Sequence, residues 1–199
     1  MLSAAFSVFA AKGYGKVSIE EICAEAGFSR GAFYSNFESV DELFQALYEE
    51  QAAVFRRRVA TVFETAGTGP AGPGRSSFLI GRLARVVLSE PRWLVLEADA
   101  RAYAARRPAA ARLHLGVRRS LAETVADGLS AHGAVPSAPG RREDAIRSVL
   151  EAYDAVTSQL ILDGDAERAR ERFAQLLLVL ACPAGRAARR PAGVGRAGQ

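Results

Sequence analysis

Apolar residues recur every three to four positions along most of the chain, which is the spacing of amphipathic helices. Stretches rich in glycine and proline at 65–76 and 133–140 interrupt the pattern and predict loops. The sequence therefore predicts an all-α protein. The predicted helices cover residues 2–12, 18–25, 30–36, 39–64, 78–89, 91–107, 109–131, 141–163 and 165–181.

Two of the short N-terminal helices, over 18–25 and 30–36, follow each other across a tight turn. Ser18 and Glu21 have the spacing of a capping box, which starts the first helix. Gly27 can adopt the left-handed backbone that ends a helix and turns the chain. Two short amphipathic helices joined in this way are typical of a helix-turn-helix.

The start of the second of these helices suits a groove. Ser29 can act as its N-cap, and Arg30 follows as a long charged hydrogen-bond donor. Gly31 and Ala32 beside it are small enough to let the backbone approach a ligand. The sequence thus indicates a recognition helix that presents one arginine between small side chains.

At these residues the chain resembles the TetR family of bacterial repressors. That family ends its recognition helix in a Leu/Phe-Tyr-x-His/Asn-Phe run followed by Ser-Lys-Glu-x-Leu. The match is close over about the first fifty residues and continues only as a helical pattern. The bland alternative is that these aromatic residues are ordinary core residues of a helical bundle. Here the two runs read Phe33-Tyr34-Ser35-Asn36-Phe37 and Ser39-Val40-Asp41-Glu42-Leu43.

The resemblance implies a two-fold dimer that places helix 30–36 in the major groove of DNA and reads a palindromic operator. Arg30 is the expected base contact, bidentate to a guanine, and Gly31 keeps the helix close. The remaining expected DNA-binding residues contact phosphates or orient on them. They are Lys16, Ser18, Ser29, Tyr34 and Asn36.

Three features count against strong DNA binding. Val40 stands where the family usually has a lysine close to a phosphate, and Met1 falls inside the expected first helix, so we expect an N-terminally trimmed start. Residues 1–50 hold three basic and eight acidic side chains, so the net charge of +4 does not lie in the predicted helix-turn-helix domain. An alternative function is therefore a dimeric ligand-binding or adaptor protein that has lost effective DNA binding.

The expected domains are a helix-turn-helix domain at 1–45, a ligand-binding and dimerisation domain at 46–182, and a disordered tail at 183–199. By resemblance, a small apolar inducer binds in the second domain and releases the protein from its operator. Four aromatic residues are candidates for the cavity wall, although plain core positions are the alternative. They are Phe78, Trp93, Tyr103 and Tyr153.

The last two predicted helices carry apolar faces wider than one neighbouring helix would cover. The resemblance implies that this pair packs against its copy as a four-helix bundle. The alternative is that these faces serve only the core of the monomer. The expected interface residues are Leu160, Ile161, Leu176, Leu177 and Leu180.

The sequence lacks the residue patterns that other classes of function need. His114 and His132 are isolated, and Cys23 and Cys182 show no metal-ligand spacing, so we expect no catalytic site, metal or cofactor. The longest apolar run, 176–182, is far short of the ~20 residues of a membrane span. The sequence predicts a cytoplasmic, ligand-responsive transcriptional repressor.

Overall fold

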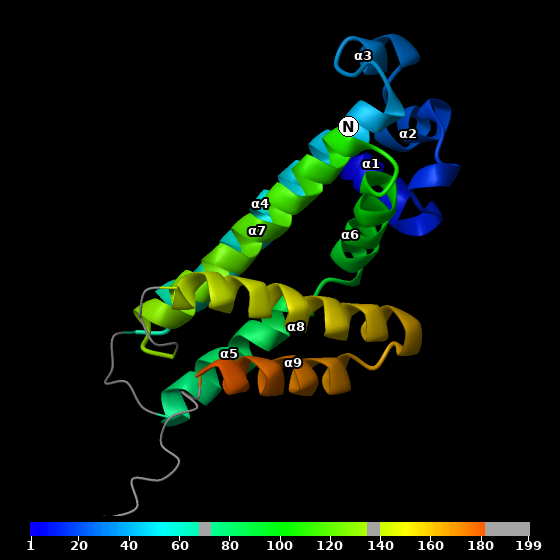
Figure 1. The fold of residues 1–199 in the computed structure, drawn as a ribbon. Coiled ribbons are helices and arrows are strands. Elements are labelled where there is room, and N and C mark those ends of the chain that lie inside the picture. Colours follow the sequence, from blue (N-terminus) through cyan, green and yellow to red (C-terminus); the bar gives the residue numbers. More distant parts are fainter. Residues whose placement is uncertain (68–72, 135–139, 182–199) are drawn as a thin grey trace, which may run out of the picture.

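The computed structural model describes residues 1–67, 73–134 and 140–181, and these residues are arranged as helices joined by short turns (Figure 1). Each predicted helix is present within the described ranges, and Cys182 with the predicted tail lies outside them. The helices are α1 (Leu2–Lys12), η1 (Tyr14–Lys16, a 3-10 turn), α2 (Ile19–Ala26), α3 (Arg30–Tyr34), α4 (Val40–Glu64), α5 (Pro73–Val87), α6 (Pro91–Ala104), α7 (Pro108–Ala131), α8 (Arg141–Asp163) and α9 (Ala166–Ala181).

Three helices differ from their predicted bounds by two residues or more, and one of them, α6, ends at Ala104 rather than at residue 107. α5 begins at Pro73 rather than at residue 78. α3 ends at Tyr34, two residues early, because the side chains that follow bind backbone carbonyls of the helix. Ser35 Oγ donates to the carbonyl of Gly31 at 2.9 Å, and Asn36 Nδ2 donates to that of Ala32 at 2.8 Å.

The N-terminal helices pack around a small aromatic core. Phe9 of α1, Phe33 of α3 and Phe44 of α4 are buried, and the rings of Phe9 and Phe44 meet edge to face at 5.3 Å. Ile22 of α2 joins them. This core fixes α2 and α3 at one end of the molecule, where α3 forms the tip (Figure 1).

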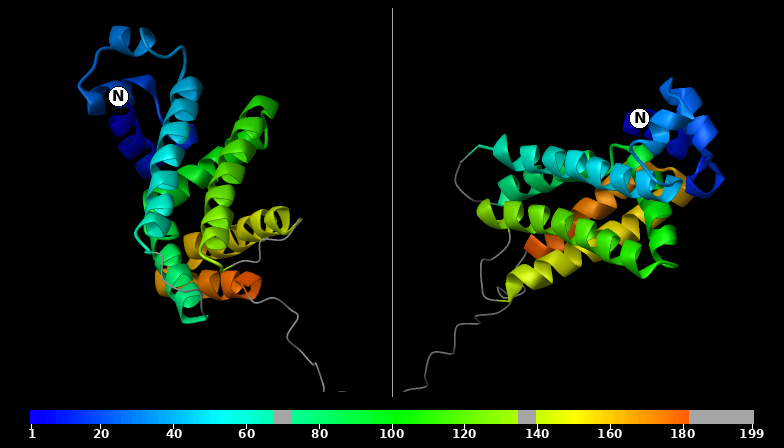
Figure 2. Two further views of the ribbon diagram at one scale, coloured as in Figure 1. Left: turned by 90° about the vertical axis from the view of Figure 1, so that its left-hand side faces the viewer. Right: turned by 90° about the horizontal axis from the view of Figure 1, so that it is seen from above.

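α4 and α7 run alongside each other down the length of the molecule (Figures 1 and 2). One tight contact between them is formed where Gly128 of α7 faces Phe63 of α4. A Cβ atom at Gly128 would lie 2.4 Å from the Phe63 ring, so only glycine leaves room for that ring. The close approach locks the two long helices together at the end far from α3.

α8 and α9 lie across this pair, and α5 packs against α9 (Figure 1). Phe173 and Leu177 of α9 and Ile80 and Leu83 of α5 are almost completely buried. The second core is therefore built from α4 to α9. It is continuous with the N-terminal core through α4 and α6.

Candidate functional site

The turn between α2 and α3 has the geometry that the sequence predicts. Ser18 Oγ accepts from the Glu21 amide at 3.3 Å, and Glu21 Oε2 accepts from the Ser18 amide at 2.9 Å, which confirms the capping box. Gly27 has φ 67° and ψ 27°, a left-handed backbone that ends α2. Ser29 Oγ accepts from the Ala32 amide at 3.1 Å and caps α3.

The outer face of α3 is exposed, and an ion pair of Arg30 with Glu20 links it to α2. Phe33 points into the core, whereas Tyr34 is 52% exposed and Arg30 and Gly31 are exposed beside it. A Cβ atom at Gly31 would meet only Ser29 Oγ, at an ordinary 3.7 Å. The protein's own fold therefore does not require glycine at this position.

The structure brings the seven predicted DNA-binding residues to the same end of the molecule. Six of them are exposed and Ser18 is half-buried. Three of the seven also hold the backbone, because Ser18 and Ser29 cap helices and Asn36 binds the carbonyl of Ala32. Arg30, Tyr34 and Lys16 are the long side chains left to reach a ligand.

Acidic residues of α2 pair with two of the three basic residues of this domain. Arg30 Nη1 lies 2.6 Å from Glu20 Oε1, and Lys12 Nζ lies 2.6 Å from Glu21 Oε1. The Tyr34 hydroxyl and then Glu20 raise the pKa of Arg30, so its guanidinium stays charged. Lys12 and the Ser18 amide lower the pKa of Glu21 to about 2.

Polar contacts join α6 to residues 1–45, the expected helix-turn-helix domain, which is called the reading domain below. Asp41, in the first turn of α4, accepts from the hydroxyls of Tyr14 and Tyr103 and forms an ion pair with Arg107 at 3.2 Å. Asp99 of α6 accepts from the Tyr14 amide at 2.8 Å. Tyr103 therefore joins α6 to α4, and it is not among the residues that line the internal pocket between α4 and α9, where the sequence analysis expected it.

An internal pocket lies between α4, α5, α6, α7, α8 and α9. It contains about 450 Å³ of empty space, some of it open to solvent, and about 40 Å³ of it admits the centre of a water molecule. Trp93 and Tyr153 are among the residues that line it. The prediction for Phe78 is wrong, because this side chain is 60% exposed and the next residues, Leu79 and Ile80, face the core instead. The full lining is Phe55, Val59, Val87, Trp93, Glu97, Arg118, Leu121, Ala122, Val125, Val149, Leu150, Tyr153 and Phe173.

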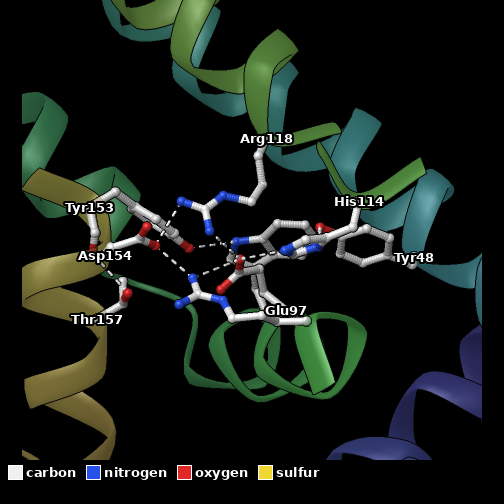
Figure 3. Close-up of polar contacts among 9 residues, drawn as sticks. Tyr48, Glu97, His114, Arg118, Tyr153, Asp154 and Thr157 are labelled. Carbon is white, nitrogen blue, oxygen red and sulfur yellow. Dashed lines mark hydrogen bonds and ion pairs between the residues drawn. The ribbon is translucent and has the colours of Figure 1, made fainter. Parts of the chain in front are cut away.

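One wall of the pocket carries two largely buried charged residues, Glu97 and Arg118, that the sequence analysis missed, and two half-buried ones, Arg101 and Asp154, pair with them (Figure 3). Glu97 is almost fully buried, and its Oε1 lies 3.3 Å from Arg101 Nη2 and 3.9 Å from Arg118 Nη1. Asp154 Oδ1 in turn lies 2.6 Å from Arg101 and 2.7 Å from Arg118. Burial raises the pKa of Glu97, and the two guanidinium groups oppose that rise.

Aromatic side chains surround the charged wall. The Trp93 ring stacks on those of Phe55 and Tyr48, with centroids 5.1 and 5.6 Å apart, and its Nε1 donates to the Tyr153 hydroxyl at 3.1 Å. Tyr48 is hydrogen-bonded to His114 Nδ1 at 2.9 Å. Burial lowers the pKa of His114 to about 4, so this imidazole is neutral near pH 7.

The predicted interface residues divide into two groups. Ile161 is exposed and Leu160 and Leu176 are half-buried, so they remain available to a partner. Leu177 is fully buried under its own chain, so the structure does not support a partner contact there. The Leu180 side chain lies outside the described residues. The sequence analysis missed the two most exposed apolar residues of α8 and α9, Leu162 and Val179.

The described parts of the chain hold no group of three or more potential metal ligands, and none of their helices is long and apolar enough to cross a membrane. The chain thus combines a helix-turn-helix whose outer face is exposed with a helical domain that encloses an internal pocket.

Comparison with known proteins finds a family match for the N-terminal part of the chain. Residues 1–47 match the model of bacterial regulatory proteins of the tetR family. The Tn10 TetC protein of Escherichia coli is 34% identical over 61 residues, a stretch that spans 31% of this chain and 31% of that protein.

Solved structures share the fold over most of the chain. A protein assigned to the TetR family of transcriptional regulators from Mesorhizobium loti has a TM-score of 0.74 at 19% identity, covering 90% of this chain and 92% of its own. A transcriptional regulator from Saccharomonospora viridis, solved in complex with choline, has a TM-score of 0.71 at 14% identity, covering 88% and 92%. The described chain therefore shares the fold of solved TetR-family transcriptional regulators, and its residues 1–47 match the model of that family.

Proposed function

We propose that this chain is a ligand-responsive repressor that binds a palindromic operator as a homodimer. The observation that carries the proposal is the outer face of α3, where Arg30, Gly31 and Tyr34 are exposed while Phe33 anchors the helix from behind. A short helix held this rigidly, with a small residue beside its arginine, fits the major groove. Residues 1–45 form the reading domain in this proposal, and the remaining helices bind the ligand and the second copy.

The pocket supports the ligand-responsive part of the proposal. Trp93 and Glu97 of α6 line the pocket, and Asp99 and Tyr103 of the same helix contact the reading domain. A small molecule that widens the pocket shifts α6, and the shift is transmitted to α1 and α4 through those contacts. The separation of the two reading domains in the dimer then no longer matches the operator.

Operator binding is the first test. The purified protein is titrated against DNA from the promoter region next to its own gene in a gel-shift assay, with Arg30→Ala and Tyr34→Phe as variants. Arg30→Ala is expected to bind about 5- to 100-fold more weakly and to lose discrimination at one base pair per half-site. Tyr34→Phe is expected to weaken binding to all sequences alike, and uniform loss for Arg30→Ala refutes the base contact.

A second candidate function, a dimeric ligand-binding protein without effective DNA binding, is favoured by the electrostatics of the reading domain. Arg30 is paired with Glu20, and Val40 packs against the core where the family usually has a lysine. Phosphate contacts dominate the affinity of DNA-binding proteins and strengthen at low salt. An intact dimer that fails to bind its promoter DNA even at about 50 mM salt supports this second function.

A further inference from the structure

The charges on the pocket wall constrain what the pocket can hold. We propose that it takes an uncharged ligand, with an apolar body and one hydrogen-bonding group that meets the carboxylate of Glu97. This inference rests on the ligand-binding part of the proposed function and specifies its chemistry. It follows from the balance of buried charges, the distribution of polar atoms and the shape of the pocket.

The balance of charge is the first step. Two charged residues line the pocket, Glu97 and Arg118, and both side chains are largely buried. Behind them Arg101 and Asp154 form a second pair of opposite charges at 2.6 Å. With both carboxylates and both guanidinium groups charged, these four side chains sum to zero, and His114 beside them is uncharged near neutral pH. A charged ligand would add an uncompensated charge to a site that is shielded from water, which is costly.

The polar atoms lie on one side of the pocket, so the ligand has one polar end. Trp93 Nε1 is already bound to the Tyr153 hydroxyl, which leaves the hydroxyl proton free to donate. Among the described residues, the one hydrogen bond to the Glu97 carboxylate is donated by Arg101 Nη2 to Oε1, at 3.3 Å. Its Oε2 remains as an acceptor for a hydroxyl or amide proton of the ligand. The rest of the wall is aliphatic or aromatic.

The width of the pocket is the third step. Only about 40 Å³ of the space admits the centre of a water molecule, so a ligand of drug-like size must push the walls apart as it enters. Trp93 and Glu97 are on α6, so the wall that yields includes the helix bound to the reading domain. Binding of a ligand in the pocket and release of the protein from DNA are thereby coupled.

A matched set of probes tests the charge of the ligand. 4-Phenylbutan-1-ol, 4-phenylbutylamine and 4-phenylbutyrate share one apolar body and carry a neutral, a positive and a negative head at pH 8. Trp93 is the only tryptophan of the chain and lies on the pocket wall, so its fluorescence reports binding directly. We expect saturable binding of the alcohol, at least about tenfold tighter than that of either charged probe. Equal or tighter binding of a charged probe, or no saturable signal from any of the three, overturns the proposal.

Glu97→Gln gives an independent readout. The amide keeps the size of the side chain but leaves Arg101, Arg118 and Asp154 with one positive charge in excess, so the preference is expected to shift toward 4-phenylbutyrate by at least about tenfold. Glu151→Gln, an exposed change on α8, is the matched control and is expected to leave the ranking unchanged. If the folded Glu97→Gln variant ranks the affinities of the three probes as the wild type does, the role of Glu97 is refuted. If that variant does not fold, the affinities of the wild type alone decide the charge of the ligand.

Failure of this inference can be told from failure of the proposed function. Operator binding by the free protein is measured in the gel-shift assay, where no probe is present. If the protein binds operator but prefers a charged probe, the proposed repressor function stands and only the proposal of an uncharged ligand fails. If the protein prefers the alcohol but binds no operator, the proposal of an uncharged ligand stands and the repressor function fails.

Discussion

Arg30 has two competing partners in the proposed function. In the free protein its guanidinium is bound to Glu20 at 2.6 Å, and both side chains are exposed. To reach a base edge, the guanidinium must leave this carboxylate, which then remains close to the negatively charged DNA backbone. Glu20 therefore weakens operator binding both by holding Arg30 and by repelling phosphates.

Glu20→Gln is accordingly expected to raise operator affinity by about two- to tenfold at low salt, with a smaller gain at high salt. Glu25→Gln removes the same charge from an exposed position of the same helix and is the control for general repulsion. Filter binding of both variants at two salt concentrations measures the difference. Equal gains in the two variants would show that the pairing with Arg30 has no effect of its own.

His114 gives the stability of the protein a predictable dependence on pH. Its folded pKa is about 4, whereas an unfolded histidine titrates near pH 6.5. Between these values the unfolded chain binds a proton that the folded chain does not bind. The contribution of His114 to the free energy of unfolding is therefore complete above about pH 6.5 and is lost as the pH falls toward 4.

His114→Gln is expected to remove this contribution. The variant is less stable than the wild type at pH 7.5, because it loses the ring that packs on Tyr48. The gap in melting temperature narrows as the pH falls from 6.5 to 4.5. Glu97, with its raised pKa, changes stability in the opposite direction, but it is present in both proteins and cancels in the difference. His132→Gln is the control, and parallel curves for wild type and His114→Gln contradict the assignment.

At the scale of helices, the sequence predicts bounds well where the signals are local. The helices from Leu2 to Lys12 and from Arg141 to Asp163 have their predicted ends, and the capping box of Ser18 lies where the spacing indicates. α3 ends early because Asn36 binds back to the helix, a choice between two local hydrogen-bonding patterns that the sequence does not settle.

The pocket is less predictable because its polar wall combines residues from three helices. Glu97 of α6 stands in an otherwise apolar stretch, which is a signal that the sequence offers. Its partners Arg118 and Asp154, on α7 and α8, cannot be paired with it until the helices are placed in space. Phe78 shows the same limit, because a helix with apolar residues on two faces does not reveal which face is inside.

The contact between α4 and α7 makes a prediction at this scale. Gly128→Ala places a methyl group against the ring of Phe63, so the free energy of unfolding is expected to fall by about 1–3 kcal/mol. Gly116→Ala is the matched control, since it is on the same helix with open space around its Cβ position. That variant is expected to gain about 0.5–1 kcal/mol from helix propensity. Chemical denaturation of both measures the contrast, and similar stabilities for the two variants contradict the close approach.

At the scale of the whole molecule, α4 and α6 span the distance between pocket and recognition helix. α4 begins at the reading domain, where Asp41 accepts a hydrogen bond from Tyr103 and pairs with Arg107. Further along, Phe55 and Val59 of α4 line the pocket. α6 carries pocket residues and contacts to the reading domain within one helix. The two sites are therefore joined by helices rather than by a flexible linker. This arrangement suits the proposed function, in which a ligand controls the affinity for DNA.

The proposed dimer depends on the outer face of α8 and α9. Leu177 is buried under its own chain, so a charge there would unfold the monomer and could not test assembly. Leu162 is 82% exposed on α8 and Val179 is similarly exposed on α9, which is unusual for large apolar side chains on a protein surface. A second copy that covers this face by two-fold symmetry accounts for both residues.

Leu162→Glu is expected to split the dimer, because an isologous interface brings two copies of each new charge into the same desolvated contact. Operator affinity falls with it by at least about tenfold, although α3 is untouched, since the two half-sites are no longer bound as one unit. Leu115→Glu makes the same change at a residue that is 65% exposed on α7 and is expected to leave both assembly and affinity unchanged. Sedimentation at micromolar concentration measures the assembly of each protein. A wild type that sediments as a monomer, or a Leu162→Glu variant that remains a dimer, excludes this face as the interface.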